Sequence, residues 1–148
     1  MASNGIDILV VDDEEAWRDI LSYYAEPYGL TIRTFESGWE AIHYLRGLPS
    51  WDMPKAYFVD MRTGDDHNDR ASEAELESPL EIFWRAKAKG ADKYFRFLTG
   101  HYSDHDAHVK GITNAQVILK GEKGANGKIK QVLEAVSAEK QYSHNPGA

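Results

Sequence analysis

The chain has 148 residues, of which 42% are hydrophobic and 28% charged, and this size fits one domain and leaves no room for a second. It contains no cysteine, which excludes thiol catalysis, zinc–thiolate sites and disulfide frameworks. With 24 acidic against 17 basic residues, the formal net charge is −7, so direct binding of nucleic acid is disfavoured because its phosphates would be repelled.

No segment of the sequence has the pattern of a membrane anchor or a secretion signal. No apolar run approaches the roughly 20 residues of a membrane-spanning helix, and no basic leader precedes an apolar stretch. We therefore expect a cytoplasmic protein with no membrane insertion. The only shift in composition is an acidic, polar stretch from Gly64 to Ser78.

Five apolar segments predict β-strands, at residues 8–11, 30–35, 56–59, 94–98 and 115–119. Four of them are mostly continuous in apolar character, which is typical of parallel strands that are covered on both faces of a sheet. The segment 30–35 alternates, so one of its faces should be less buried.

Helical patterns separate these strands. From Trp17 to Tyr24, apolar residues recur at i, i+3, i+4 and i+7, and Pro27 with Gly29 would end this helix. The segment 37–40 has the capping-box pattern Ser-x-x-Glu, which predicts the start of a second helix.

The second half of the chain predicts three more helices. Ser78 and Pro79 repeat the start pattern, with the proline where its missing N–H is not needed, so the third helix should begin near Pro79. A shorter helix is expected at about 103–110, ending near Gly111, and the last one spans 129–136 at helical spacing. Residues 141–148 are polar and should form a frayed tail.

Strands and helices in this alternation predict an α/β fold with a parallel sheet, helices on both faces and right-handed crossovers. Parallel strands end on the same edge, and ligands bind outside those carboxyl ends. The residues that follow the predicted strands are therefore neighbours in space: Asp12, Asp13, Asp60, Thr99 and Lys120.

Three carboxylates at one edge repel one another unless one is protonated or a cation neutralises them. A divalent cation with oxygen ligands is the simplest resolution, and Mg²⁺ favours one or two carboxylates together with water and phosphate oxygens. Lys120 adds a positive charge suited to a phosphoryl oxygen, and Thr99 adds a hydroxyl donor. This set of groups predicts phosphoryl chemistry on a carboxylate.

Four motifs at these strand ends resemble the signatures of the response-regulator receiver domain of two-component signalling. They are Leu9-Val-Val-Asp-Asp13, Phe58-Val-Asp-Met61, Phe97-Leu-Thr-Gly100 and Leu119-Lys120. No single motif is specific, but four in this order are, and the likeness runs from about residue 6 to residue 139. The resemblance implies a (βα)5 flavodoxin-like fold in three layers, with a five-stranded parallel sheet in the order 2-1-3-4-5.

The resemblance also implies the chemistry of the site. Asp60 would accept a phosphoryl group from a phosphohistidine on a sensor histidine kinase or a histidine phosphotransfer protein. Thr99 would donate its hydroxyl to that group, and Lys120 would pair with one of its oxygens.

The same resemblance implies a metal site for Mg²⁺ or Mn²⁺. Asp13, Asp60 and the backbone carbonyl of Arg62 would be the ligands, and Asp12 would act mainly through a water. The output would be a small shift of loops and of the face built from the fourth helix, the fifth strand and the last helix.

We expect a single receiver domain over residues 1–140, with a long acidic insertion at about 61–78 and a polar tail over 141–148. Because no output domain follows Lys140, the protein should work alone through protein contacts. The downstream partner is not defined by the sequence, and a homodimer is compatible with it. At most, the chain would catalyse its own phosphorylation and dephosphorylation, so it would not be a conventional enzyme.

The chain departs from the receiver pattern at several positions. Gly121 stands where proline usually follows the lysine, Val117 stands where an aromatic switch residue is common, and Gly64 replaces a frequent proline. The insertion 61–78 is either a solvated loop or a lid beside Asp60 whose acidic charge repels small phosphodonors.

Three alternatives have different sequence requirements. A phosphatase of the haloacid-dehalogenase type would need a second aspartate two residues after Asp60, where this chain has Arg62. A degenerate receiver acting only as an interaction module is favoured by Gly121, Val117 and the insertion. Dinucleotide binding is the weakest alternative, because the first strand leads into four acidic residues and not into a glycine-rich turn.

Two further groups of residues are singled out by the sequence. The spacing of His101, His105 and His108 would place them on one helical face, which we interpret as surface decoration rather than a transition-metal site. His101, two residues past Thr99, would border the site and could make it sensitive to pH near neutrality. The four tryptophans are interpreted as core or interface anchors: Trp17, Trp39, Trp51 and Trp84.

Overall fold

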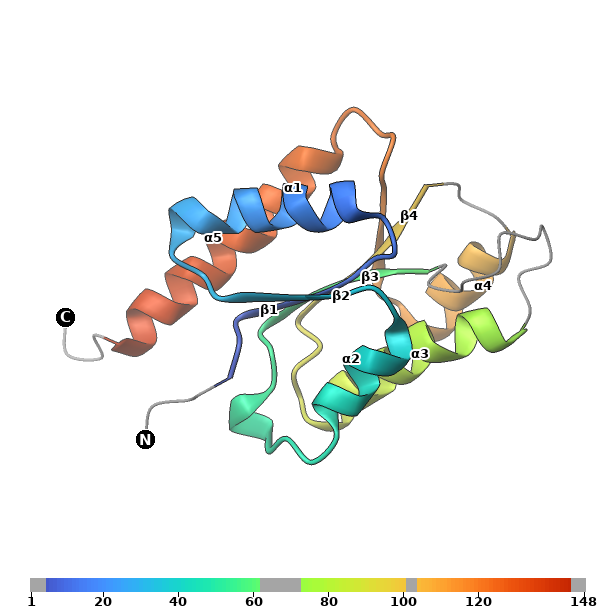
Figure 1. Ribbon diagram of the computed structural model, residues 1–148, viewed down its shortest axis with the longest axis horizontal. Coiled ribbons are helices and arrows are strands. Elements are labelled where there is room, and N and C mark those ends of the chain that lie inside the picture. The colour runs from blue at the N-terminus through green and yellow to red at the C-terminus, as the bar shows by residue number, and fades with distance from the viewer. Residues whose placement is uncertain (1–4, 62–72, 101–103, 145–148) are drawn as a thin grey trace.

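The computed structural model describes residues 5–61, 73–100 and 104–144, and these form alternating strands and helices (Figure 1). In chain order they are β1 (Ile8–Val11), α1 (Glu15–Ala25), the 3₁₀ turn η1 (Glu26–Tyr28), β2 (Ile32–Phe35), α2 (Gly38–Leu45), the 3₁₀ turn η2 (Ser50–Asp52), β3 (Ala56–Asp60), α3 (Glu73–Ala88), β4 (Tyr94–Thr99), α4 (Asp104–Thr113), β5 (Gln116–Leu119) and α5 (Ala125–His144).

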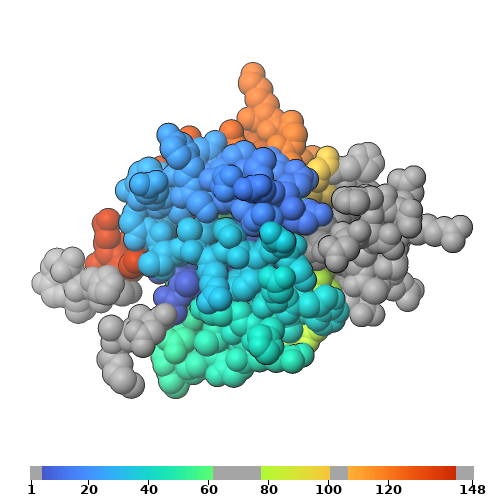
Figure 2. Space-filling model, in the orientation of Figure 1, coloured from blue at the N-terminus to red at the C-terminus, as the bar shows by residue number. Residues whose placement is uncertain are grey.

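The five strands form one parallel sheet in the order β2-β1-β3-β4-β5, which confirms the predicted topology. Helices α1 and α5 cover one face of the sheet, and α2, α3 and α4 cover the other, so the fold has three layers (Figure 1). In the space-filling view, α1 in blue lies in the upper part of the molecule and α2 in turquoise in the lower part, on either side of the sheet, whose edge is turned to the reader (Figure 2). Among the described residues, no helix combines the length and apolar character that crossing a bilayer requires.

The core is divided by the sheet into two apolar clusters. In β1, Leu9 and Val11 pack with the side chains of α2 and α3, whereas Ile8 and Val10 pack with those of α1 and α5. All four residues are fully buried, and so are the first four residues of β3. The continuous apolar runs of the sequence are thus explained by central strands that have a helical layer on each side.

The start of the third helix differs from the prediction. We expected it near Pro79, but α3 begins at Glu73 and Pro79 lies inside it. Residues 73–77 are Glu, Ala, Glu, Leu and Glu, and such strong helix formers allow the helix to start upstream of the proline. The predicted insertion at 61–78 therefore includes the first turns of α3, while its residues 62–72 lie outside the described part of the chain.

Two other helix ends lie beyond the predicted residues. Helix α4 passes Gly111 and ends at Thr113, because Asn114 adopts the left-handed backbone conformation (φ 57°) that stops a helix. Helix α5 runs to His144, so the segment that we expected to fray after Lys140 is helical over its first four residues. An ion pair holds this part of α5 in place, because Lys140 Nζ lies 2.8 Å from Oδ2 of Asp7, the residue that directly precedes β1.

Three of the four tryptophans are not core residues, because Trp39, Trp51 and Trp84 are 50%, 65% and 43% exposed. The other interpretation of these three, as interface anchors, stays a prediction. Trp17 is partly buried and packs against the cluster between the sheet, α1 and α5.

Candidate functional site

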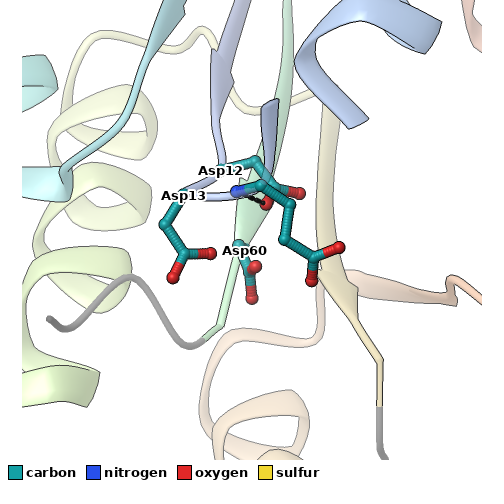
Figure 3. Close-up of side chains that lie close together, drawn as sticks. Asp12, Asp13 and Asp60 are labelled. Atoms are coloured by element: carbon teal, nitrogen blue, oxygen red, sulfur yellow. Dashed lines mark hydrogen bonds between the residues drawn. The ribbon is translucent and has the colours of Figure 1, made fainter. Parts of the chain in front are cut away.

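The carboxyl ends of four neighbouring strands bring the predicted site residues together. Asp12 and Asp13 directly follow β1, and Asp60 and Thr99 are the last residues of β3 and β4. Lys120 directly follows β5. Figure 3 shows Asp12, Asp13 and Asp60 grouped at this edge. Arg62, whose backbone carbonyl was predicted to bind the metal, lies outside the described residues.

The turn after β1 is fixed by hydrogen bonds of Asp12. Its backbone N–H donates to the Phe35 carbonyl at 3.0 Å, which extends the pairing of β1 with β2. Its Oδ1 atom accepts the backbone N–H of Glu14 at 2.9 Å, as the dashed line in Figure 3 marks, and its carbonyl accepts from Arg18 Nη1 at 2.8 Å. Asp12 is fully buried, so these bonds hold one carboxylate oxygen within the turn and leave Oδ2 to face Lys120.

Lys120 connects the acidic residues. Its ammonium lies 2.8 Å from Asp12 Oδ2, 3.0 Å from Asp60 Oδ2 and 3.3 Å from Glu14 Oε1, and only 6% of its side chain is exposed. Its backbone N–H donates to the Thr99 carbonyl at 2.9 Å, which links the residue after β5 to the last residue of β4.

The neighbouring carboxylates keep Lys120 protonated. Burial lowers its pKa, but Asp60 and Asp12 oppose that effect, and together they raise the pKa well above its ordinary value. Lys120 is therefore a buried ammonium that lies close to three carboxylates and donates hydrogen bonds to two of them, Asp60 and Glu14.

Two neighbours of Lys120 were missed by sequence reasoning. Glu14 supplies the third carboxylate, and the ring centroid of Trp17 lies 5.6 Å from the ammonium, within the range of a cation–π contact. Glu14 could have been noticed, because it directly follows the two aspartates. Trp17 faces the site because it stands in the first turn of α1, and its helical spacing alone marked it only as an apolar residue.

The site has the ligands of a hard cation. Carboxylate oxygens of Asp12, Asp13, Glu14 and Asp60 all lie within 4.8 Å of one another. Burial and the charges of Asp12 and Glu14 raise the pKa of Asp13, although Lys120 acts in the opposite direction. Negative charge thus exceeds what one ammonium neutralises, and oxygen donors are what Mg²⁺ and Mn²⁺ prefer, so the residues present fit such an ion.

Thr99 is fully buried at the end of β4, one position beyond Leu98, which pairs with Asp60 in register. The predicted set of Asp12, Asp13, Asp60, Thr99 and Lys120 therefore converges on one edge of the sheet. Val117, where an aromatic residue is common in receivers, is partly buried and packs against the apolar cluster beneath α2, α3 and α4.

The predicted histidine face cannot be followed in full. His101 and the side chain of His105 lie outside the described part of the chain, and His108 is exposed on α4. The interpretation of these residues as surface decoration, and the pH effect proposed for His101, stay predictions.

No family model and no curated protein sequence matches the chain. Solved structures do. A response regulator receiver domain protein (CheY-like) from Methanospirillum hungatei JF-1 matches with a TM-score of 0.64 at 18% identity, over 92% of this chain and 99% of that one. A response regulator from Burkholderia pseudomallei, solved with a phosphorylated aspartic acid, a calcium ion and citrate, gives 0.59 at 20% identity, over 93% and 71%.

A third match is the beryllofluoride-activated NtrC4 receiver domain dimer, with a TM-score of 0.60 at 22% identity, over 87% of this chain and 97% of that one. At these identities the likeness concerns the fold. The chain has the flavodoxin-like fold of response-regulator receiver domains, as the sequence motifs predicted.

Proposed function

We propose that this protein is a receiver that accepts a phosphoryl group on Asp60 from a histidine kinase or a histidine phosphotransfer protein, in a reaction that depends on Mg²⁺, and that signals through protein contacts. The observation that carries the proposal is the buried Lys120 ammonium, which Asp60 and Asp12 share beside two further carboxylates. The Burkholderia pseudomallei structure, with its phosphorylated aspartic acid and calcium ion, supports the proposal by analogy of fold.

The transfer step is a displacement at phosphorus. A carboxylate oxygen of Asp60 forms the new O–P bond, while the P–N bond to the donor imidazole breaks and the imidazole nitrogen keeps that electron pair. Lys120 already contacts Asp60 Oδ2, so it is close enough to pair with a transferred phosphoryl oxygen. Thr99 would donate its hydroxyl to another oxygen of that group.

Asp12, Asp13 and Asp60 would hold the divalent cation, with Glu14 at its open side. When bound, the cation neutralises the clustered carboxylates and the oxygens of the phosphoryl group. Asp12 is rigidly placed by its turn, whereas Asp13 and Glu14 are exposed, so solvent and a phosphodonor can reach the cluster from their side.

A direct test is the intact mass of the full chain after incubation with acetyl phosphate or phosphoramidate and Mg²⁺. We expect one added phosphoryl group, no addition in EDTA, and none in Asp60→Asn. Asp19→Asn, an exposed acid on α1, is the matched control and should be labelled like the unchanged chain. If neither donor nor a set of phosphorylated kinases labels Asp60, the chain is an interaction module with a receiver fold, which is the alternative that Gly121 and Val117 favour.

Self-association belongs to the same proposal, because the NtrC4 receiver structure is a dimer. A homodimer of this chain would be detected as a rise in mass by light scattering when beryllofluoride and Mg²⁺ are added. An unchanged monomer mass would leave signalling to contacts with other proteins.

A further inference from the structure

A hollow of the molecule lies toward the amino ends of β4 and β5, away from the carboxylate cluster. Its volume is about 240 Å³, and it is lined by Tyr94, Arg96, Gln116, Lys128, Gln131 and Val132. Gln116 is the first residue of β5, whereas Lys120 follows the last, so the length of β5 separates the two places.

Arg96 is the unusual residue of this hollow. It lies on β4, the strand next to the edge strand β5, between Phe95 and Phe97, whose side chains belong to the apolar cluster on the opposite face. The Arg96 side chain is partly buried, and its guanidinium donates one hydrogen bond, to the Phe95 carbonyl at 3.1 Å. Within the described residues no carboxylate pairs with it.

Partial burial removes some of the water around this guanidinium without supplying a counter-charge. Burial lowers the pKa of Arg96, and the neighbouring Tyr94 opposes this effect only in part. A guanidinium has five N–H donors, and most of those of Arg96 have no protein acceptor in the described part of the chain. An anion placed in the hollow would supply both the charge and the acceptors that are lacking.

The surroundings of Arg96 favour an anion. Lys128 and two glutamine amides line the hollow, and none of its described lining residues is acidic. Lys128 pairs with Glu122 at 3.0 Å, but both side chains are partly exposed, and such pairs exchange at little cost. This positive site stands out on a chain whose formal net charge is −7.

A neighbouring hollow of about 330 Å³ shares Arg96 and Gln116 with the first and adds Lys87 and Lys93, and Asp92 is the one acidic residue among its described lining. The two hollows thus lie next to each other around the first residue of β5. In the described sheet β5 is an edge strand that pairs only with β4, so its outer backbone groups are available to an added strand.

We propose that Arg96 binds a carboxylate side chain from an acidic, extended segment of a partner protein that lies along β5. The first hollow, of about 240 Å³, is smaller than sites for drug-sized ligands, which usually have about 300–1,000 Å³. Its size therefore suits a single acidic side chain. The positive charges of Arg96 and Lys128 favour an acidic side chain. The edge of β5 favours an extended chain rather than a helix, because an extended backbone can pair with it. The site is independent of phosphorylation at Asp60.

The test uses the full chain and the blocked peptide acetyl-Val-Glu-Val-Glu-Val-amide, whose glutamates share one face of a strand. Binding is followed by the ¹⁵N–¹H signal of Arg96 Nε and by titration calorimetry. We expect the Arg96 signal to shift, and Arg96→Gln to weaken binding about tenfold, as loss of a charge-assisted pair should. The affinity of the Arg96→Lys variant should fall between those of the unchanged chain and the Arg96→Gln variant. Lys89→Gln, which removes an exposed charge outside both hollows, is the matched control and should bind like the unchanged chain.

Two further ligands separate the possible outcomes. The same peptide with glutamine in place of glutamate should not bind, and sodium glutarate should bind more weakly than the glutamate peptide because it cannot pair with β5. An unmoved Arg96 signal in the unchanged chain, or equal affinity of the glutamate and glutamine peptides, would overturn the site. Equal affinity of glutarate and the glutamate peptide would overturn the extended segment as its occupant.

Discussion

Replacing Lys120 by methionine tests whether this ammonium is the counter-charge of the site. Methionine keeps most of the side-chain volume and removes the charge, so the change isolates electrostatics from packing. In the absence of metal, Asp12 and Asp60 would then face each other with no cation between them. We expect Lys120→Met to destabilise the metal-free protein strongly, and we expect Mg²⁺ to restore part of the loss.

The expected loss follows from the burial of the three side chains. The side chains of Lys120 and Asp60 are each 6% exposed and that of Asp12 is 0% exposed, so these are buried ion pairs. Removing one partner of a buried pair costs about 3–5 kcal/mol, because the remaining charge is left without compensation. The contact with Glu14, which is 57% exposed, adds less than about 1 kcal/mol. The sum is about 3–6 kcal/mol, which lowers Tm by roughly 6–24 °C for a chain of this length.

The assay is thermal and urea unfolding at neutral pH, in EDTA and in excess Mg²⁺. Because the variant has one more uncompensated negative charge, Mg²⁺ should raise its Tm by more than it raises that of the unchanged chain. Lys120→Met combined with Asp60→Asn should recover about 1–3 kcal/mol, since the two sites are coupled. The exposed Lys89→Met should stay within about 0.5 kcal/mol of the parent. A Lys120→Met protein as stable as the parent in EDTA, or an equal Mg²⁺ effect in both, would refute the reasoning.

Three smaller changes follow from the same structure. Glu14→Ala removes one acceptor of Lys120 and so frees a donor for a phosphoryl oxygen; labelling by acetyl phosphate should accelerate by about two- to fivefold, and slower labelling would contradict this. Tyr57→Phe removes a buried hydroxyl that has no partner among the described residues, so it should stabilise the protein by about 1 kcal/mol in urea unfolding. Asp13 has a raised pKa in the folded state, so its ionised form destabilises the fold. Asp13→Asn should therefore stabilise the protein in EDTA at pH 7. This gain in stability should fade as the pH drops through the folded pKa of Asp13 toward the ordinary value of 3.8. A gain that does not change with pH would assign the effect of Asp13→Asn to packing.

The sequence was sufficient to place the site residues because of the geometry of parallel sheets. Each continuous apolar run had to be a strand buried on both faces, and the polar residue at its carboxyl end had to meet the others at one edge. Asp12, Asp60, Thr99 and Lys120 are placed in this way by backbone pairing alone, as the registers of β1, β3, β4 and β5 show. The positions of the apolar runs in the sequence therefore predict where these residues lie, whichever helical side chains cover the sheet.

What the sequence did not reveal depends on side-chain direction and on helix starts. Glu14 and Trp17 reach Lys120 because the turn after Asp12 sets the entry angle of α1, and no local pattern encodes that angle. The start of α3 was predicted too late, because Pro79 was interpreted as a first-turn residue although five good helix formers precede Ser78. The unpaired guanidinium of Arg96 was likewise invisible, since a single charged residue within an apolar strand does not show whether a carboxylate faces it.

Lys120 stabilises the unphosphorylated fold and is also the group proposed to bind the phosphoryl oxygens, and these two roles compete. Its ammonium already forms ion pairs with Asp12, Asp60 and Glu14, so a phosphoryl group on Asp60 must replace at least one of these contacts. Glu14 is the longest and most exposed contact and is therefore the first to be released. Because the backbone N–H of Lys120 is bonded to the Thr99 carbonyl, a shift of Lys120 acts directly on the ends of β4 and β5. Such a route needs no aromatic switch residue, which is consistent with Val117 at the position where receivers often have one.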